Sequence, residues 1–484
     1  MLKRLHSYHH WLFFFPLVVW AIVYGVLGFN GLYGQDAFQY YQFSLAIEQL
    51  LRGEPEVYSF QVPPFYPLSG AAFAVFFGHT ALFLQLISVV GLVGTTFVIS
   101  RIIHLLFPET PDKTISGYLF LWLVLSPYLL RGSLSVMTDF FTAFWASLVF
   151  YHFLLYQKSQ TGFSLAMLTA GAILAFFTRY LVAPLLFVPC LAAVWIMVRN
   201  RKFGHIVVGG IVVALFFLVY VYFKRGFTGE FFHHHLQGSW SLANVFRRSF
   251  TGPDGDTLYP VINLVNTSYQ FFHPVYLFPG FLFMFFVRKQ DFQKPEIQLI
   301  LASVALYSLF VSGLVLQNKR FLILSFLFVI VCYFPAWQHL LGKISGRWLP
   351  LLVVASVCLQ LGLFAQLFSS FYQINYTERQ LYARVAALPP APLYTFEVRL
   401  ALESYGLSAP VYDLYYPAPD TFEMGNLLLV NPVRWQPQWE NHNPMINTRY
   451  ILDNYETTVL DQLSGGWTLY RIGRRKVVEN LELR

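Results

Sequence analysis

The sequence predicts a polytopic α-helical membrane protein with about eleven transmembrane helices and a small C-terminal α/β domain. Hydrophobic residues make up 56% of the 484 residues and charged residues only 12%, whereas soluble globular proteins carry about 25% charged residues. Apolar runs of about 20 residues, the length that crosses a bilayer, recur up to residue 371. Beyond that point prolines, acids and short β-prone runs return.

The apolar runs define the predicted spans. They cover residues 11–29, 80–106, 115–131, 137–156, 162–178, 180–199, 205–223, 263–287, 297–316, 320–340 and 349–371. The first run is long for a signal sequence and has no small-residue cleavage site before Asn30, so we interpret it as a retained span. Residues 1–371 are therefore expected to form a membrane domain, with the lipid bilayer as its partner.

Basic residues fall on one side of the predicted membrane. They are Lys3, Arg4, Lys158, Arg199, Arg201, Lys202, Arg288, Lys289, Lys294, Lys343 and Arg347. The positive-inside rule assigns this side to the cytoplasm, which places the N-terminus inside. Residues 30–79, 224–262 and 372 onward then lie outside. The net charge of +8 is explained by these loops, and no nucleic-acid partner is expected.

The first external segment opens with an acid and a predicted amphipathic helix. Asp36 follows the first span at a position where it can cap a helix N-terminus. Tyr40, Phe43 and Ile47 fall on one helical face, and Gly53 ends the helix. Such a helix can lie along the membrane surface.

Residues 63–77 are apolar but short, and Pro64 and Pro67 interrupt them. Counting them as a span would move every later basic loop outside. We therefore interpret them as an interfacial or re-entrant segment packed against protein.

Residues 372–484 are expected to form an external α/β domain of ordinary size. β-prone runs occur at 392–396, 410–416, 426–430 and 467–472. Between the first two, residues 397–406 are typical of a helix that ends at Gly406.

Charged residues gather at the external boundary of the spans, which is costly next to lipid and marks functional sites. They are Asp36, Glu54, Glu56, Arg131, Asp139, Arg179, Lys224, Arg225, Glu230, Lys319 and Arg320. The cytoplasmic side carries basic loops without a comparable mixture of acids and bases. This asymmetry predicts an active site at one membrane face.

Structural explanations remain open for these residues. Asp36 and Asp139 can each cap a helix, and Arg179 and Arg320 can extend to lipid headgroups. The run His233–His235 has no partner at metal-ligand spacing. The three cysteines lie inside apolar runs without a C-x-x-C pair, so neither a zinc site nor a disulfide framework is indicated.

The motifs occur in a characteristic order. An acid follows the first span in GQDAFQYY (34–41), and VPPFYPLSGA (62–71) precedes a long span. LSPYLLRGSLSVMTDFFTAFWASL (125–148) carries an acid at the outer start of a helix, FFTRYLVAPLLFVP (176–189) turns between two spans, and QNKRFLILSFLFVI (317–330) brings an arginine into another. This order resembles the GT-C superfamily of integral-membrane glycosyltransferases, in particular bacterial relatives of protein O-mannosyltransferases and of the lipid A aminoarabinose transferase.

The resemblance implies a hexosyl or pentosyl transferase of the bacterial inner membrane. Its donor would be a polyprenyl-phosphate sugar, and the transfer would invert the configuration at the anomeric carbon. Asp36 would deprotonate or orient the acceptor hydroxyl, a general-base role worth about 10²–10⁴-fold in rate. Asp139 matches the second acid near the site. Arg320 would stabilise the departing phosphate, with Arg179 and Arg131 as further candidates. The candidates for contacts to the acceptor, which is a glycan, a lipid or a protein, are Tyr40, Glu56 and Lys319.

Two positions depart from the pattern of this superfamily. Gln61 and Val62 precede the Pro-Pro pair where relatives carry Lys or His, so a phosphate contact from that position is not supported. Gln35 precedes Asp36 where many members carry a second acid. The missing second acid weakens the case for a divalent metal held between paired carboxylates, and a metal stays only as an alternative.

Two other functions remain as alternatives. A lipid-linked glycan polymerase or ligase also works at the outer leaflet, but it should have a dominant Arg-rich external loop, and the 224–262 loop is modest. A transporter should carry polar residues near mid-membrane, whereas here they gather on one face. The sequence favours the transferase and leaves its sugar and acceptor open.

Overall fold

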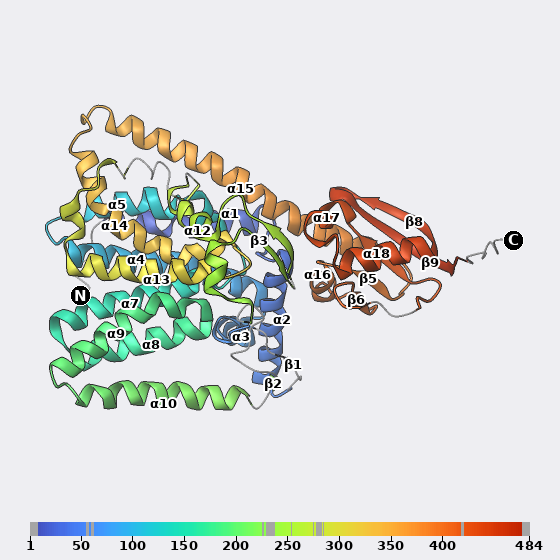
Figure 1. Ribbon diagram of the computed structural model, residues 1–484, viewed down its shortest axis with the longest axis horizontal. Helices are drawn as coiled ribbons and strands as arrows, with labels where there is room; N and C mark the ends of the chain where they lie inside the picture. Colours follow the sequence, from blue (N-terminus) through green and yellow to red (C-terminus); the bar gives the residue numbers. More distant parts are fainter. Residues whose placement is uncertain are drawn as a thin grey trace. The chain divides into compact units, whose positions relative to one another are not determined.

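The structure of the chain is a computed structural model (Figure 1). It describes residues 8–54, 58–59, 62–224, 227–228, 238–252, 254–273, 275–276, 283, 285–417 and 421–476. The chain forms two compact units. The first comprises Met1–Leu32, Tyr40–Arg248 and Tyr259–Ser370, and the second comprises Tyr33–Gln39, Ser249–Leu258 and Phe371–Arg484.

The first unit is a bundle of apolar helices. Its long members are α1 (Phe15–Gly25), α4 (Thr80–Leu106), α7 (Asp139–Ser159), α8 (Gly162–Thr178), α9 (Ala183–Arg199), α10 (Gly204–Lys224), α13 (Pro295–Ser312), α14 (Ile323–Leu341) and α15 (Leu349–Ala386), whose last residues belong to the second unit. Helices α7, α8, α9 and α10 lie side by side (Figure 1). In the described part of the chain six helices are long and apolar enough to cross a membrane, and a bent pair makes a seventh. With the shorter apolar helices, the number is roughly that predicted.

Two predicted spans are not single helices. The span predicted at 115–131 bends by 73° between a helical segment over Asp112–Val124 and α6 (Pro127–Ser133). The break follows from Pro127, because a residue before proline is pushed out of the helical region, and Ser126 has ψ 118°. The span predicted at 263–287 is wrong as a continuous helix: α12 (Asn263–Tyr269) and a short turn end at His273, which is extended before Pro274.

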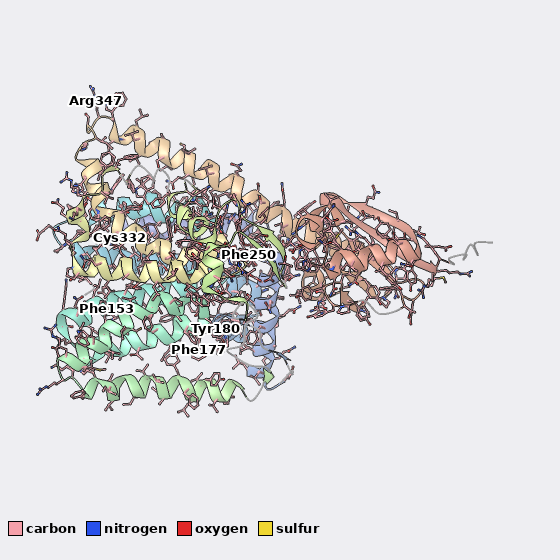
Figure 2. All side chains as sticks on the ribbon, in the orientation of Figure 1. Phe153, Phe177, Tyr180, Phe250, Cys332 and Arg347 are labelled. Carbon is pink, nitrogen blue, oxygen red and sulfur yellow. The ribbon has the colours of Figure 1, made fainter. Side chains whose placement is uncertain are left out.

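The core of the bundle brings α4 and α7 into close contact. A Cβ atom added at Gly91 would lie 2.7 Å from the backbone of Phe140, so only glycine permits this approach. Phe153 and Cys332 lie buried inside the bundle (Figure 2). All three cysteines are free, as expected from their positions in apolar runs.

The segment 63–77, predicted to be interfacial or re-entrant, forms α3 (Phe65–Phe77). Its 13 residues are too few to span a bilayer. Tyr66 is fully buried, and its hydroxyl donates to the carbonyl of Leu84 at 2.8 Å. The helix is therefore packed against protein, as predicted.

The second unit contains the predicted α/β domain. Its sheet has the order β6-β5-β7-β9-β8. Strands β5 (Leu393–Thr395), β6 (Val411–Asp413) and β7 (Leu427–Val430) are parallel, and β8 (Tyr455–Leu463) and β9 (Trp467–Arg475) complete the sheet in antiparallel pairing. Helices α16 (Arg399–Ser404), α17 (Pro432–Trp439) and α18 (Asn443–Asn454) connect the strands. The wholly apolar, buried β7 is typical of a central strand in a parallel sheet.

Two further segments complete the second unit. The hairpin of β3 (Ser249–Gly252) and β4 (Gly255–Leu258) packs on α17, where the amide of Gln438 donates to the carbonyl of Asp254. The start of α2 (Gly34–Leu51) donates the amide of Gly34 to Glu378 at 3.0 Å. One compact unit thus gathers parts of all three regions predicted to be external.

Candidate active site

Asp139 is the centre of a buried ion-pair cluster in the first unit. It is the first residue of α7 and is only 2% exposed. One carboxylate oxygen accepts from the Nη1 of Arg179, and the other lies 3.2 Å from the Nε of Arg320. Three separate chain segments therefore meet at one carboxylate. The charges are one acid and two guanidinium groups, so the three side chains together carry one positive charge.

The local geometry rules out a simple capping role for Asp139. The residue before α7, Thr138, makes no side-chain cap, and Asp139 lies inside the first turn with its carboxylate directed to the arginines. An acid at this position is also favoured by the positive end of the helix dipole.

Arg179 is placed by a break between two helices. It adopts an extended conformation after α8 ends at Thr178, and a short turn over Tyr180–Val182 leads into α9. Its guanidinium carbon lies 5.3 Å from the centre of the Phe321 ring, and the residue is 8% exposed. The alternative in which Arg179 extends to lipid headgroups is therefore wrong.

Arg320 is placed by the turn Lys319–Leu322 that opens α14. The side chain of Asn318 caps this turn by accepting the amide of Arg320 at 3.0 Å. The guanidinium also donates to the sulfur of Met137 at 2.9 Å, two residues before Asp139. Arg320 is thus held against the start of α7 rather than directed to lipid.

Arg131 and Lys319 belong to a neighbouring aromatic cluster. The guanidinium of Arg131 lies 4.3 Å from the ring centre of Tyr128, a cation–π distance. That ring contacts Tyr276, with 4.4 Å between ring centres, and the hydroxyl of Tyr276 donates to the carbonyl of Lys319 at 2.7 Å. The cluster fixes the backbone that leads directly into Arg320.

Asp36 lies on the surface of the second unit. The predicted helix is confirmed as α2, with Tyr40, Phe43 and Ile47 buried, but it begins at Gly34, so Asp36 lies in its first turn and is not the cap residue. Its carboxylate is exposed at the positive end of the helix.

The other sequence candidates have different outcomes. Tyr40 is buried edge-on against Tyr66, with 5.6 Å between ring centres, which is a packing contact. Glu56, Gln61 and the run His233–His235 lie outside the described residues. Among the residues that the structure does describe, no group of three or more His, Cys, Asp or Glu side chains could hold a metal ion.

Sequence reasoning missed Gln85, a fully buried amide in the second turn of α4. Its Nε2 donates to the carbonyls of Phe29 at 3.3 Å and Leu134 at 2.7 Å, and its Oε1 accepts from the indole of Trp20 at 3.0 Å. The signal was present, because a single amide inside an apolar helix needs internal partners.

Gln85 links the chain segment that precedes Asp36 to the one that precedes Asp139. Phe29 lies in the segment that leads to α2, and Leu134 lies in the segment that leads to α7. A direct backbone bond, from the amide of Val136 to the carbonyl of Gly31 at 2.9 Å, ties the same two segments. Gly31 has φ +80°, and an added Cβ would lie 2.9 Å from the Gln85 side chain, so this crossing requires glycine.

The chain matches solved structures over 94% of its length. It is similar to the crystal structure of ArnT from Cupriavidus metallidurans bound to undecaprenyl phosphate, with a TM-score of 0.54 at 14% identity over 94% of this chain and 98% of that chain. The chain has the ArnT fold. The apo structure of the same protein gives a TM-score of 0.53 at 13% identity, over 94% of this chain and 97% of that chain. The predicted resemblance to GT-C glycosyltransferases is thereby confirmed at the level of the fold.

No protein-family model matches the chain, and no curated protein matches it. At 14% and 13% identity, this likeness establishes the fold of the chain.

Proposed function

We propose that the protein is a glycosyltransferase that moves a sugar from a polyprenyl-phosphate donor to an acceptor at the external face of a bacterial inner membrane. The observation that carries this proposal is the buried cluster of Asp139, Arg179 and Arg320. It occurs in the ArnT fold, and the ArnT crystal structure contains bound undecaprenyl phosphate.

Arg179 and Arg320 bind the donor phosphate. Guanidinium groups match the geometry of phosphate oxygens and form charge-assisted hydrogen bonds with them. Asp139 offsets one of the two positive charges and holds both side chains in place before the donor arrives. When the bond between the sugar and the phosphate breaks, negative charge grows on the phosphate, and donors that are already oriented stabilise it most effectively.

Asp36 acts on the acceptor. Its carboxylate takes the proton of the acceptor hydroxyl, and the hydroxyl oxygen attacks the anomeric carbon from the face opposite the phosphate. The new bond joins that oxygen to the anomeric carbon, while the electron pair of the broken bond leaves with the polyprenyl phosphate. The configuration at the anomeric carbon is inverted. The loops tied by Gln85 support this role, because they hold the segments before Asp36 and Asp139 at a fixed crossing.

The donor class is tested by mass spectrometry of lipids that co-purify with the protein. We expect a polyprenyl phosphate or its sugar conjugate on the native protein and at least about tenfold less on Arg320→Gln, since a charged hydrogen bond is worth about 1.5–3 kcal/mol. Arg320→Gln leaves Asp139 paired with Arg179, so folding should be preserved. The control is Arg347→Gln, because Arg347 is exposed in the loop between α14 and α15 (Figure 2).

The absence of any polyprenyl lipid from native protein, or equal amounts on the native and Arg320→Gln proteins, would contradict the proposed donor site. A lipid-linked polymerase would also retain a polyprenyl lipid, but its carrier would bear a growing glycan rather than a single sugar.

A further inference from the structure

Glu378 is a buried acid in the part of α15 that extends beyond a membrane span. The helix has 38 residues, about 57 Å at 1.5 Å per residue, whereas the hydrocarbon core is about 30 Å thick. Its residues from Phe371 onward belong to the second unit. Glu378 is 4% exposed there, and its Oε2 has no hydrogen-bond partner among the described residues.

The other carboxyl oxygen of Glu378 holds the start of α2. It accepts the backbone amide of Gly34 at 3.0 Å, across 344 residues of sequence. First-turn amides of a helix lack partners within the helix, and a nearby side chain usually caps them. Here the cap comes from α15. Gly34 has φ +63°, a conformation that favours glycine.

Aromatic contacts of the second unit hold the same helix start from both sides of Asp36. The rings of Tyr33 and Phe371 stack with 3.9 Å between centres. Phe38 lies edge-on to Tyr405, with 5.5 Å between ring centres. Asp36 is two residues beyond Gly34, about 3 Å along the helix axis, so the hydrogen bond to Glu378 is made two residues before Asp36.

We propose that Glu378 is a positioning residue for Asp36, and that it acts as a neutral carboxylic acid. This inference rests on the proposed function, because Asp36 has a chemical role only in that account. The neutral form still offers the Gly34 amide a carbonyl-like acceptor, without the cost of burying a negative charge.

The surroundings of Glu378 favour the neutral form. Burial raises the pKa of Glu378 to about 8, and although the Gly34 amide and Arg434 oppose this rise, Glu397 adds to it. The charged or titratable groups around Glu378 are Arg434 from α17, Glu397 from the segment after β5, Tyr405 after α16, and Arg379 on α15 itself. Glu378 is therefore neutral at pH 7 and ionises as the pH rises through about 8.

Two substitutions separate position from charge. Glu378→Gln keeps the acceptor for Gly34 and stays neutral at every pH. Glu378→Leu keeps a similar size and removes the acceptor. The matched control is Glu456→Gln, because Glu456 is an exposed acid on β8 of the same unit.

The first readout is the rate of sugar transfer between pH 6 and 9.5, with kcat and the KM for the donor separated. We expect kcat of the native enzyme to fall as the pH rises through about 8, and the Glu378→Gln enzyme to match native at pH 7 without that fall. We expect Glu378→Leu to lose about tenfold or more in kcat at every pH, because small displacements of a reacting group are costly. Its KM for the donor should stay within about twofold of native, since Arg179 and Arg320, the proposed phosphate ligands, belong to the first unit.

The second readout is hydrogen–deuterium exchange, which needs no activity. Glu378→Leu should speed exchange in the peptide that covers residues 33–43, while Glu378→Gln and Glu456→Gln leave it unchanged. Native exchange and native kcat in Glu378→Leu would overturn the positioning role. An alkaline fall in Glu378→Gln with the native midpoint would overturn the neutral-acid role. A protein inactive with every polyprenyl donor would remove the proposed transferase instead, and the exchange result would still decide whether Glu378 holds Gly34.

Discussion

At the scale of single residues, the cluster around Asp139 makes a prediction about stability. Removing one partner of a buried ion pair leaves the other charge buried and uncompensated, at a cost of about 3–5 kcal/mol. Asp139→Asn removes the charge that both guanidinium groups share, so the unfolding temperature in detergent should fall markedly, and transfer should be lost as well. The control is Asp461→Asn, whose partner Arg384 is 3.7 Å away on the surface, and exposed pairs contribute at most about 1 kcal/mol. Equal shifts for the two variants would show that the Asp139 pair is not buried as described.

Glu378 makes a separate residue-scale prediction about pH. Its pKa is about 8 in the folded protein and 4.5 in an unfolded chain, so the folded state binds more protons between these values. The stability that this group contributes is fully present below pH 4.5 and is lost as the pH rises through about 8. Thermal unfolding from pH 5 to 9 should therefore show a steeper decline for the native protein than for Glu378→Gln. Parallel curves would mean that Glu378 ionises normally.

At the scale of elements, Gln85 connects three segments and should be sensitive to substitution. Gln85→Leu leaves the carbonyls of Phe29 and Leu134 and the indole of Trp20 without their partner, and each unsatisfied buried group costs about 1–3 kcal/mol. Transfer activity should fall through kcat rather than through the donor KM. Gln366→Leu on the exposed face of α15 is the control and should behave as native. A Gln85→Leu enzyme with native kcat would show that the crossing of the two loops does not position the acids.

The comparison of elements also shows what the sequence can and cannot predict. Hydropathy located α4, α9, α10 and α14, because a continuous apolar run of sufficient length leaves few alternatives to a buried or lipid-facing helix. It missed the break at Pro127 and the end of α12, because a window average is insensitive to one proline. Gln85 escaped notice because a window average is equally insensitive to one amide in an apolar run.

The sequence could not predict which acid pairs with which arginine around Asp139. Asp139 and Arg179 are 40 residues apart, and nothing in local sequence states which acid meets which arginine. That Asp139, Arg179 and Arg320 lie on a common side of the bundle could be predicted, because consecutive spans alternate direction. Glu378 lacked even that signal, since it follows a span as one acid among several polar residues, and the sequence does not show that Gly34, 344 residues away, would meet it.

At the scale of the whole molecule, the predicted topology places the N-terminus inside and residues 372–484 outside. Cysteines introduced at Lys202, in the loop before α10, and at Val433, which is 81% exposed on α17, should react with membrane-impermeant reagents from opposite sides. The background for this labelling lacks the three native cysteines. Reaction of both positions from the same side would overturn the orientation that the positive-inside rule gives.

The central claim is that Asp36 is the base of a sugar transfer from a polyprenyl phosphate, and the rate of transfer by Asp36→Asn tests it most directly. Native and variant proteins are placed in nanodiscs with the polyprenyl-phosphate sugar identified on the purified protein, and the release of polyprenyl phosphate is followed. Asn preserves the size and the helix-start preference of Asp, but its amide cannot act as a general base. The account predicts a loss of about 10²-fold or more in kcat with an unchanged unfolding temperature. A stably folded Asp36→Asn enzyme with the native rate would contradict it.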